Sequence, residues 1–581
     1  MKASTWLRKM RFKPLWLMVV ILALIVACGS ADVEPATEAP AATTAPAATA
    51  APQATAAPTQ APSSAREFKI SKVRFALPTP DVESNRTWVG VWLYIVQHDV
   101  FAETLLRVDE DTSEVGPLLA ESWEIDNDFK TWSFKLREGI PWQFGWGDFS
   151  SADVLHSYNL VNREDSLAIL KEPAWSQVAV EVVDEFNITF NFDNPYLSGE
   201  RLFSRWAGDL ILVSKAQFDE QGLGAYDQVE TAGTGPYQLT DRKLGESLSY
   251  EKVPDGHWKY DVDFEEFEFV WAPESLTRMA MLLAGEAHLS QVERTLQPDA
   301  EARGMKVINS ANEAAQTYTM FGGLYRENTE EWPDHFTPGL PLQNMNIRKA
   351  LNIAIDRDAI NKEIYLDRAT QSYNYGFHQN NEGWNPEWVE RWDEMYGYDP
   401  DEARALLAAE GYDEDNPLNL KFISTTIPGS PELHDVIEAT QIMYADVNVN
   451  LEIERLDFGT WLSRGRDHEL ENTMRASRNL PIRSTQEGIR VFYTNHYASW
   501  YLNEPFVNET YLCLEQSADL EERDQCARDI GNFIYDNYMV APMFQLYADV
   551  TVNPEFIESY VWPGLTSAGV SHFHNIKGVR E

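Results

Sequence analysis

Residues 131–140 carry the sequence Thr-Trp-Ser-Phe-Lys-Leu-Arg-Glu-Gly-Ile. Apolar and polar side chains alternate along its first six positions, which predicts a β-strand, because successive side chains of a strand point to opposite faces of a sheet. The large apolar side chains of Trp132, Phe134 and Leu136 then share the buried face. The stretch therefore predicts one half-buried strand of a packed sheet.

The flanking sequence predicts further elements of the same body. Residues 72–77, Lys-Val-Arg-Phe-Ala-Leu, alternate in the same way and stop at Pro78, which predicts another strand. Residues 91–106 place apolar side chains at roughly helical spacing. A second helix is predicted to begin near residue 150, with Ser150 or Ser151 as N-cap and Asp153 in the first turn.

These stretches belong to an ordered series of short motifs. The first group is E-x-L at 103–105, P-x-L-A-x-S-W-E at 117–124, T-W-x-F-x-L-R-x-G at 131–139 and S-A-D-V at 151–154. Four later groups are G-T-G-P-Y at 233–237, L-A-G-E-A at 283–287, N-I-R-K-A-L-N-I-A-I-D-R at 346–357, and Y-D-P-D-E-A-R-A-L-L at 398–407 followed by E-G-Y at 410–412. In this order the motifs resemble the extracytoplasmic solute-binding proteins of ABC importers, family 5, the oligopeptide, dipeptide and nickel-binding class. His288 stands where the family usually has Asp.

The motifs themselves have structural interpretations. Ile347, Ala350, Leu351 and Ala354 fall on one face of a helix. Gly235 is expected to adopt a positive φ before Pro236. The motifs therefore identify the scaffold rather than the ligand site.

The resemblance implies an α/β fold of the two-lobed periplasmic-binding-protein type II-like kind, with an extra domain in the first lobe. Carried over to this chain, the core of lobe I takes residues 68–104, 232–311 and 537–581. The extra domain takes 105–231 and lobe II takes 312–536. Residues 317–321 and 540–547 are the expected crossings between the lobes.

The N-terminus has the pattern of an export signal with a lipidation site. Basic residues precede an apolar run from Leu15 to Ala27, and this run is shorter than the roughly 20 residues of a spanning helix. The run ends Leu-Ile-Val-Ala before Cys28, which resembles the bacterial lipobox. We therefore expect a signal peptide at 1–27 and acylation of Cys28; a buried cysteine or an uncleaved membrane anchor are the alternatives. Residues 28–67 are then the lipid anchor and a disordered tether, because Ala, Pro and Thr dominate 30–65.

Composition narrows the function further. The chain has 581 residues and a formal net charge of −44, which argues against nucleic acid and against a polybasic membrane patch. Once Cys28 is acylated, Cys513 and Cys526 remain, and an even pair in an exported chain predicts a disulfide worth about 3 kcal/mol, with two buried thiols as the alternative. We expect a monomer without cofactor.

Catalytic and metal motifs find no support in the sequence. The chain has no H-E-x-x-H, C-x-x-C, P-loop or G-x-S-x-G pattern, and His572-x-His574 is its only close histidine pair. Paired acids are expected from an acidic composition, and a glycosidase would need two specific ones across a cleft. We therefore expect no metal site and no enzyme activity.

The ligand-binding candidates come from the resemblance and from the aromatic content. The chain has 19 Trp, several of them in polar stretches, and interdomain clefts commonly have aromatic walls with a few polar anchors. The family takes its ligand contacts from the segment after the first strand and from later loops of lobe II. The candidates are Asn85, Arg86, Trp88, Trp461, Arg475, Arg478 and Trp500. Each of them has packing or the surface as its alternative role.

The second-lobe stretch departs from the family. Peptide binders place an Asp there for the ligand's amine, whereas 470–483 contains Arg475, Arg478 and Arg483 and no Asp. Arginine binds carboxylate or hydroxyl oxygens, so an anionic solute or an oligosaccharide joins a peptide as a candidate ligand, and pairing of the arginines with surface acids is the alternative. The predicted function is capture of a solute between the lobes for a membrane ABC permease, outside the cytoplasm. A polysaccharide hydrolase on a stalk, or a sensing module without a permease, remain the alternatives.

Overall fold

The computed structural model describes residues 67–581, apart from 80–82, 90–91, 169–170, 172–173, 207–209, 228, 327–335, 428–429, 480–483, 495–501 and 565–568. Cys28, Arg483 and Trp500 therefore lie outside the described residues, as do the predicted signal peptide and tether. The described residues belong to one compact unit, Arg66–Glu581.

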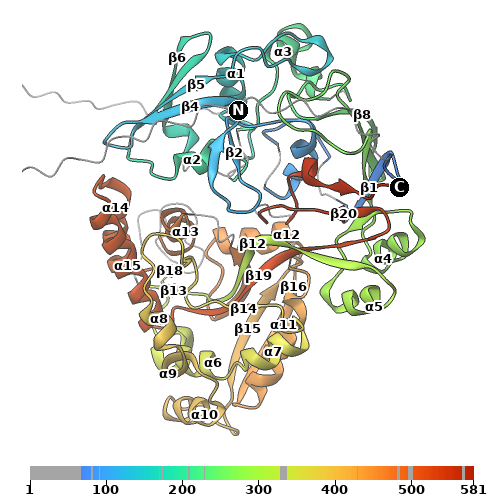
Figure 1. Cartoon of the computed structure of the whole chain (residues 1–581). Coiled ribbons are helices and arrows are strands. Elements are labelled where there is room, and N and C mark those ends of the chain that lie inside the picture. The colour runs from blue at the N-terminus through green and yellow to red at the C-terminus, as the bar shows by residue number, and fades with distance from the viewer. Residues whose placement is uncertain are drawn as a thin grey trace, which may run out of the picture. The chain divides into compact units, whose positions relative to one another are not determined.

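A large mixed sheet runs through this unit (Figure 1). Among the described residues it has 11 strands, and β12 and β19 lie at its middle. In sheet order the path is β16 (Val449–Arg455), β15 (Leu418–Ser424), β17 (Thr473–Asn479), β12 (Lys306–Phe321), β19 (Val540–Val552), β11 (Leu289–Ser290), β1 (Lys72–Leu77), β10 (Glu266–Trp271), β9 (Ser247–Lys252) and β8 (Tyr237–Lys243), with β14 (Thr370–Gln371) on β19. The predicted strand at 72–77 is confirmed as β1.

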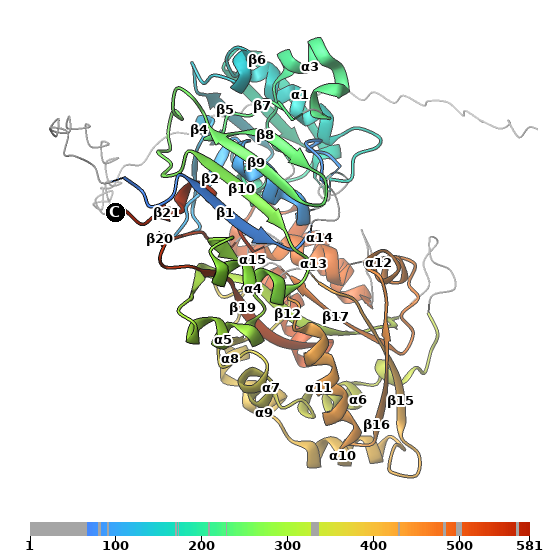
Figure 2. The same ribbon diagram turned by 90° about the vertical axis from the view of Figure 1, so that its right-hand side faces the viewer.

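The sheet divides into two ends, and these are the two lobes of the fold. Figure 2 shows β1, β8, β9 and β10 side by side at one end, and β15 and β16 with α11 at the other. At the first end β1 pairs parallel with β10, and at the second β15 pairs parallel with β16. The α/β, two-lobed architecture expected from the sequence is confirmed.

Strands β12 and β19 join the two lobes. They pair antiparallel along most of their length, from Lys306 opposite Val552 to Met320 opposite Val540. The register shifts three times between Asn309 and Tyr318, and each such bulge bends the strands and increases their twist. The bulges lie where β12 passes from one core to the other, since Ala314 packs in the first-lobe core and Ala315 in the second. The crossings predicted at 317–321 and 540–547 stay predictions.

A four-stranded antiparallel sheet contains the strand predicted at residue 131. Trp132, Phe134 and Leu136 are buried, as the alternation predicts. They pack with the aromatic side chains of β7 and with Phe203, whose ring centroid is 4.6 Å from that of Phe134. The sheet order is β4 (Ala120–Ile125), β5 (Thr131–Leu136), β7 (Asn187–Phe192) and β6 (Val178–Asp184).

Three two-stranded ladders complete the strands. They are β2 (Leu106–Val108) with β3 (Val115–Pro117), β13 (Leu324–Tyr325) with β18 (Leu502–Asn503), and β20 (Ile557–Ser559) with β21 (Lys577–Gly578).

The helices of the first half are mostly short. The predicted helix near residue 150 is confirmed as α1, with Ser150 and Asp153 forming a capping box. The helix expected over 91–106 is shorter, a 3-10 helix that ends at Val100, and residues 106–108 form β2 instead. The helices are η1 (Trp92–Val100), η2 (Gln143–Gly145), α1 (Ser151–Val161), η3 (Trp175–Gln177), α2 (Gly199–Leu202), α3 (Lys215–Gln221), η4 (Gly222–Tyr226), α4 (Ser275–Ala284), η5 (Arg294–Leu296) and α5 (Gln297–Ala302).

Most helices of the second half lie around the second-lobe end of the sheet, with α13, α14 and α15 on one side of it and α11 beside β15 and β16 (Figure 1). The exception is the last short helix, whose Phe573 packs in the first-lobe core. The predicted apolar face of α6 is confirmed, since Ile347, Ala350, Leu351 and Ala354 are all buried in one large core. The helices are η6 (Pro341–Gln343), α6 (Met345–Ile353), α7 (Arg357–Glu363), α8 (Glu387–Glu390), α9 (Trp392–Tyr396), α10 (Pro400–Ala409), α11 (Leu433–Ala445), α12 (Phe458–Arg466), α13 (Thr485–Tyr493), α14 (Pro505–Gln516), α15 (Leu520–Asp536) and η7 (Phe573–Asn575).

The glycines of the G-T-G-P-Y motif have a different role from the predicted one. The predicted positive φ at Gly235 is wrong, because the described glycines with a positive φ do not include it. Instead, a Cβ at Gly233 would lie 1.9 Å from the carbonyl oxygen of Phe101, and one at Gly235 would lie 2.9 Å from it. Gly235 N donates to that same oxygen over 2.8 Å. Glycine is therefore required because two backbone segments touch.

The buried His98 on η1 predicts acid sensitivity. Burial lowers its pKa from 6.5 to about 3, although the ring bonds to Ser84 O at 2.8 Å. The unfolded chain takes up a proton below pH 6.5 and the folded protein does not, so stability falls as the pH drops from 6.5 towards 3. Between pH 7.5 and 4.5 we expect His98 to account for a loss of about 2–3 kcal/mol.

Urea unfolding at several pH values tests this contribution. The variant His98→Gln is expected to lose about 2–3 kcal/mol less than the wild type between pH 7.5 and 4.5, whatever its stability at pH 7.5. Identical pH slopes for the two proteins would contradict a neutral, buried His98.

Candidate functional site

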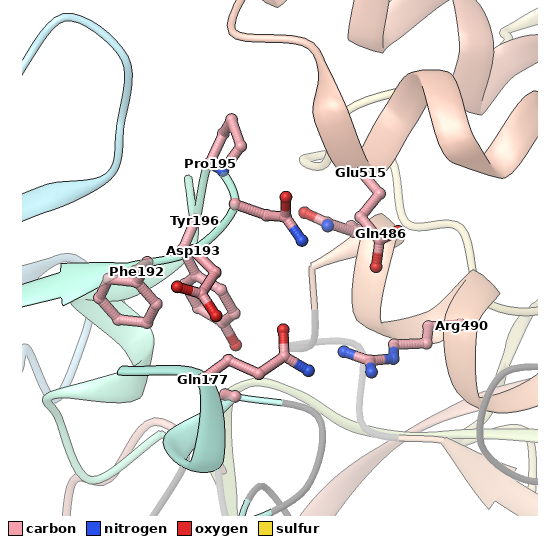
Figure 3. Close-up of a pocket in the computed structure, with 10 residues that line it drawn as sticks. Gln177, Phe192, Asp193, Pro195, Tyr196, Gln486, Arg490 and Glu515 are labelled. Carbon is pink, nitrogen blue, oxygen red and sulfur yellow. The ribbon is translucent and has the colours of Figure 1, made fainter. Parts of the chain in front are cut away.

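A small cavity lies between a turn that follows β7 and the helix α13 (Figure 3). Its volume is about 30 Å³, which holds about two water molecules. The labelled side chains come from one side as Gln177, Phe192, Asp193, Pro195 and Tyr196, and from the other as Gln486, Arg490 and Glu515. The cavity as it stands is therefore too small for a peptide-sized solute.

The turn after β7 presents Tyr196 to the cavity. Asp193, Asn194 and Pro195 are turn-forming residues at the end of the strand. The backbone N–H of Tyr196 donates to Phe129 O over 2.8 Å, and its ring stacks on Phe192 with centroids 5.0 Å apart. Backbone and ring are thus both fixed, and the hydroxyl points across the cavity.

Helix α13 forms the opposite wall. Its N-cap, Ser484, accepts from Glu487 N over 3.2 Å. Arg490 follows Gln486 by four residues and Glu487 by three, so the three side chains lie on one side of the helix. The amide of Gln486 and the guanidinium of Arg490 line the cavity, and the Glu487 carboxylate accepts from Tyr196.

Two of the described hydrogen bonds connect this part of the first lobe to the second lobe. Tyr196 Oη donates to Glu487 Oε1 over 2.9 Å, and Arg201 Nη2 donates to Asn381 Oδ1 over 3.3 Å. Burial, together with the Glu487 carboxylate, raises the pKa of Tyr196 well above its usual value. The phenol therefore remains protonated and a donor at any physiological pH.

The three candidates after the first strand contact other residues of their own lobe. Asn85 Nδ2 donates to Thr231 Oγ1 over 2.7 Å, and Arg86 makes two bonds of 2.8 and 2.7 Å to Asp227. Trp88 is fully buried and meets the ring of Tyr226 edge-on at 5.2 Å. These contacts hold the segment 84–88 against 226–231, and a ligand contact for these residues stays a prediction.

Two of the second-lobe candidates come together. The Arg475 guanidinium lies 3.4 Å from the ring centroid of Trp461, and both side chains are buried. Burial lowers the pKa of Arg475 to about 10, so it remains charged at neutral pH. Arg475 pairs with Met320 and Arg478 with Thr317 on regularly paired strands, so the two arginines point to opposite faces of the sheet.

The residues of these two hydrogen bonds are not predicted by the sequence. Tyr196 and Glu487 are 291 positions apart, and Arg201 and Asn381 are 180 apart. The Asp-Asn-Pro turn was a usable signal for the end of β7. Nothing in either local sequence indicates its partner.

The described residues were also searched for metal sites and membrane-spanning helices. They contain no group of three or more His, Cys, Asp or Glu side chains placed to hold a metal. His572 Nε2 bonds to Val108 O at 3.0 Å. In the part of the chain that the structure describes, we find no helix with the length and apolarity needed to cross a membrane.

Comparison with known proteins identifies the family. The family described as "Bacterial extracellular solute-binding proteins, family 5 Middle" matches residues 114–481, which is more than half of the chain. The chain belongs to this family. Its members bind solutes outside the cytoplasm, as the ordered motifs of the sequence indicate.

Individual relatives are distant. The "Dipeptide-binding protein" of Escherichia coli (strain K12) is 25% identical over 62% of this chain and 67% of its own length. A dipeptide-binding protein from Pseudoalteromonas sp. SM9913 in complex with Met-Leu matches with a TM-score of 0.70 and 17% identity, over 87% of this chain and 100% of that one. NikA from Brucella suis in complex with Fe(III)-EDTA matches with a TM-score of 0.69 and 18% identity, over the same two shares. At such identities the solved structures support the fold, and their ligands differ.

Proposed function

We propose that this protein is the extracytoplasmic receptor of an ABC importer, which captures a peptide-like or other polar solute between its two lobes. The observation that carries the proposal is the cavity whose walls come from the segment 174–196 and from α13–α14. A receptor of this kind needs no covalent chemistry. It needs two walls that separate, admit a solute and close on it.

The lining favours a polar ligand. Amides from Gln177, Asn194 and Gln486 both donate and accept hydrogen bonds, Arg490 donates, and Glu515 accepts. Such a mixture matches the alternating N–H and C=O groups of a peptide better than a purely apolar or purely anionic solute. A related dipeptide-binding protein of E. coli agrees with this choice.

Closure would depend on the solute through differential affinity. Tyr196 and Glu487 meet only when the walls meet, so their hydrogen bond belongs to the closed state. A solute stabilises that state only to the extent that it binds it more tightly than the open one. The closed receptor then presents one surface to a permease, and the open one presents another.

Cys28 supplies the location in this proposal. An acylated Cys28, followed by the Ala, Pro and Thr-rich segment to residue 67, would hold a monomeric body near the membrane while it samples the solution. Labelling with a fatty-acid analogue tests the anchor: wild-type protein is expected to carry the label and Cys28→Ser to lack it. Equal labelling of both proteins would overturn it.

Mass spectrometry of purified protein under native conditions tests the function. Because closed walls retain solute, we expect a bound peptide-like mass that is lost on unfolding, and titration with that compound should then saturate at one per chain. Steady conversion of the compound into products would instead favour the hydrolase alternative.

Tyr196→Phe tests the closing contact. The change removes the donor to Glu487 and leaves the carboxylate facing the other wall without this bond, so affinity for the recovered solute should fall about tenfold or more. Isothermal titration calorimetry measures the loss. Tyr398→Phe, at an exposed position, is the matched control and should bind like the wild type. An unchanged affinity for Tyr196→Phe would show that closure does not use this contact.

A further inference from the structure

The hairpin of α14 and α15 stands behind the second-lobe wall of the cavity. A disulfide between Cys513 and Cys526 joins the two helices. Both helices lie beside α13 in Figure 1. One side of the hairpin reaches the cavity directly, because Glu515 of α14 lines it.

Arg523 connects this hairpin to α13. Its side chain is fully buried, and its guanidinium bonds to the carbonyl oxygens of Leu514 and Ser517 at the end of α14. Nη2 also donates to Gln486 Oε1 over 2.8 Å. The Arg523 guanidinium therefore caps the C-terminal carbonyl groups of α14 and fixes the side chain of Gln486, which lines the cavity.

The next residue of α15, Asp524, holds the loop that contains Asn381. Asp524 Oδ1 accepts from Gly383 N over 2.7 Å. Gly383 has a φ of +76°, and a Cβ there would lie 2.5 Å from the Cβ of Ala527. The chain thus lies directly on α15 at residue 383, two residues after Asn381, which receives the hydrogen bond from Arg201 of the first lobe.

Arg523 also approaches the acid between these two residues. Its Nε lies 3.9 Å from Glu382 Oε2. Thr485 Oγ1 of α13 donates to the carbonyl oxygen of Glu382 over 2.7 Å. Loop 381–383 and the first turn of α13 are therefore tied to each other and to α15.

Both second-lobe partners of the first lobe thus rest on one helix. Asn381 is placed through Asp524 and Gly383, and Gln486 and Glu487 are placed through Arg523 and Thr485. We infer that Arg523 is a positioning residue for solute binding, and that the disulfide-linked α14–α15 hairpin is the platform that holds the second-lobe wall in its closing geometry. The inference rests on the proposed function, because it assigns a role in binding.

A preorganised wall loses little conformational freedom when it closes. The platform increases affinity by reducing this entropic cost. Without Arg523, Gln486 and loop 381–383 must be ordered at each closing event. Affinity then falls even where the fold persists. A purely structural Arg523 would lower thermal stability and leave the affinity of the folded molecules unchanged.

Hydrogen exchange and binding to an equimolar pool of tripeptides test the platform in the full-length protein. The variants are Arg523→Gln, Asp524→Ala, and the pair Cys513→Ser with Cys526→Ser. The control is Gln525→Ala, which removes an exposed side chain that contacts only Asp529 among the described hydrogen bonds. Exchange is followed without peptide at 381–383, at 484–490 and in β8–β10 as a distant reference.

In the Arg523→Gln variant we expect about tenfold faster exchange at 381–383 and 484–490, unchanged exchange in β8–β10, and about tenfold weaker binding of the peptides that the wild type retains. Asp524→Ala should affect 381–383 alone. If Arg523 acts through Gln486, adding Gln486→Ala to Arg523→Gln should cost less than the sum of the two single losses.

The outcomes separate the two proposals. Unchanged exchange at both segments in all three variants overturns the platform, whether or not the wild type binds a tripeptide. A wild type that retains no tripeptide while the exchange changes appear as expected supports the platform and counts against a peptide-like solute. Should Arg523→Gln fail to fold, Asp524→Ala and the serine pair decide the platform by exchange and affinity together. Faster exchange with unchanged affinity would make the platform purely structural and overturn its role in binding.

Discussion

Replacing Arg348 by alanine is expected to lower the free energy of unfolding by about 3–5 kcal/mol. Arg348 lies on α6 and its side chain is almost completely buried. Its guanidinium makes five described hydrogen bonds of 2.7–3.1 Å, all to the carbonyl oxygens of Leu342, Gln343, Asn537 and Tyr538. Its removal leaves these acceptors, at two buried and two half-buried residues, without that donor.

The planar fork of arginine explains why this position needs arginine. Two chain segments converge on Arg348: residues 342–343 at the end of η6, and residues 537–538, which follow α15. Burial lowers the pKa of Arg348 to about 10, and it stays charged at neutral pH. Lysine carries three donors on one nitrogen and cannot reach both segments, so Arg348→Lys should lose an intermediate amount.

Urea unfolding followed by circular dichroism measures the loss. The matched control is Arg404→Ala on α10, whose side chain is 42% exposed and pairs with Asp401; it should change stability by less than about 1 kcal/mol. If Arg348→Ala were no more destabilising than Arg404→Ala, water would be replacing the guanidinium, and α6 would not depend on it.

Local features of the fold were accessible from the sequence. Alternation over six residues predicts β5, and Ser150 with Asp153 predicts the start of α1, because neighbours along the chain decide both features. The same information misses Gly235. Glycine is needed at this position because the backbone of Phe101, 134 positions away in the sequence, leaves no room for a side chain. Its own φ does not require glycine.

The site was less accessible for the same reason. The sequence directs attention to tryptophans and arginines in polar stretches, yet Trp88 packs against Tyr226 and Arg86 pairs with Asp227 within one lobe. Tyr196 and Glu487 look ordinary where they stand, and only the fold brings them together. Trp500 and Arg483 lie outside the described residues, and their roles remain predictions.

Arg294 carries the second large effect. It lies on η5, directly after the β11 region, and its Nη1 is 3.1 Å from Glu432 Oε1, just before α11 in the second lobe. Its Nη2 is 2.8 Å from Asp549 Oδ2 and donates to Tyr547 O over 2.7 Å, both on the crossing strand β19. One guanidinium thus ties both lobes to the strand that joins them.

Burial protects these charges from solvent and makes them depend on each other. The three side chains are 8%, 3% and 12% exposed. Burial opposes the charge of Arg294, but Asp549 and Glu432 together raise its pKa above the usual value. We expect Arg294→Met to cost about 3–5 kcal/mol of unfolding free energy, because it leaves two buried carboxylates without their cation.

The triple variant Arg294→Met, Glu432→Gln, Asp549→Asn separates the charge effect from lost packing. It removes the stranded carboxylates, so it should be more stable than Arg294→Met alone although it carries more substitutions. Urea unfolding in 0.1 and 1 M NaCl should give the same loss for Arg294→Met, since a buried pair is poorly screened. Arg303→Met removes the exposed pair with Asp299 and should cost less than about 1 kcal/mol. A triple variant less stable than the single one would mean that the carboxylates are hydrated without Arg294, and that the arginine contributes by packing rather than by joining the lobes through charge.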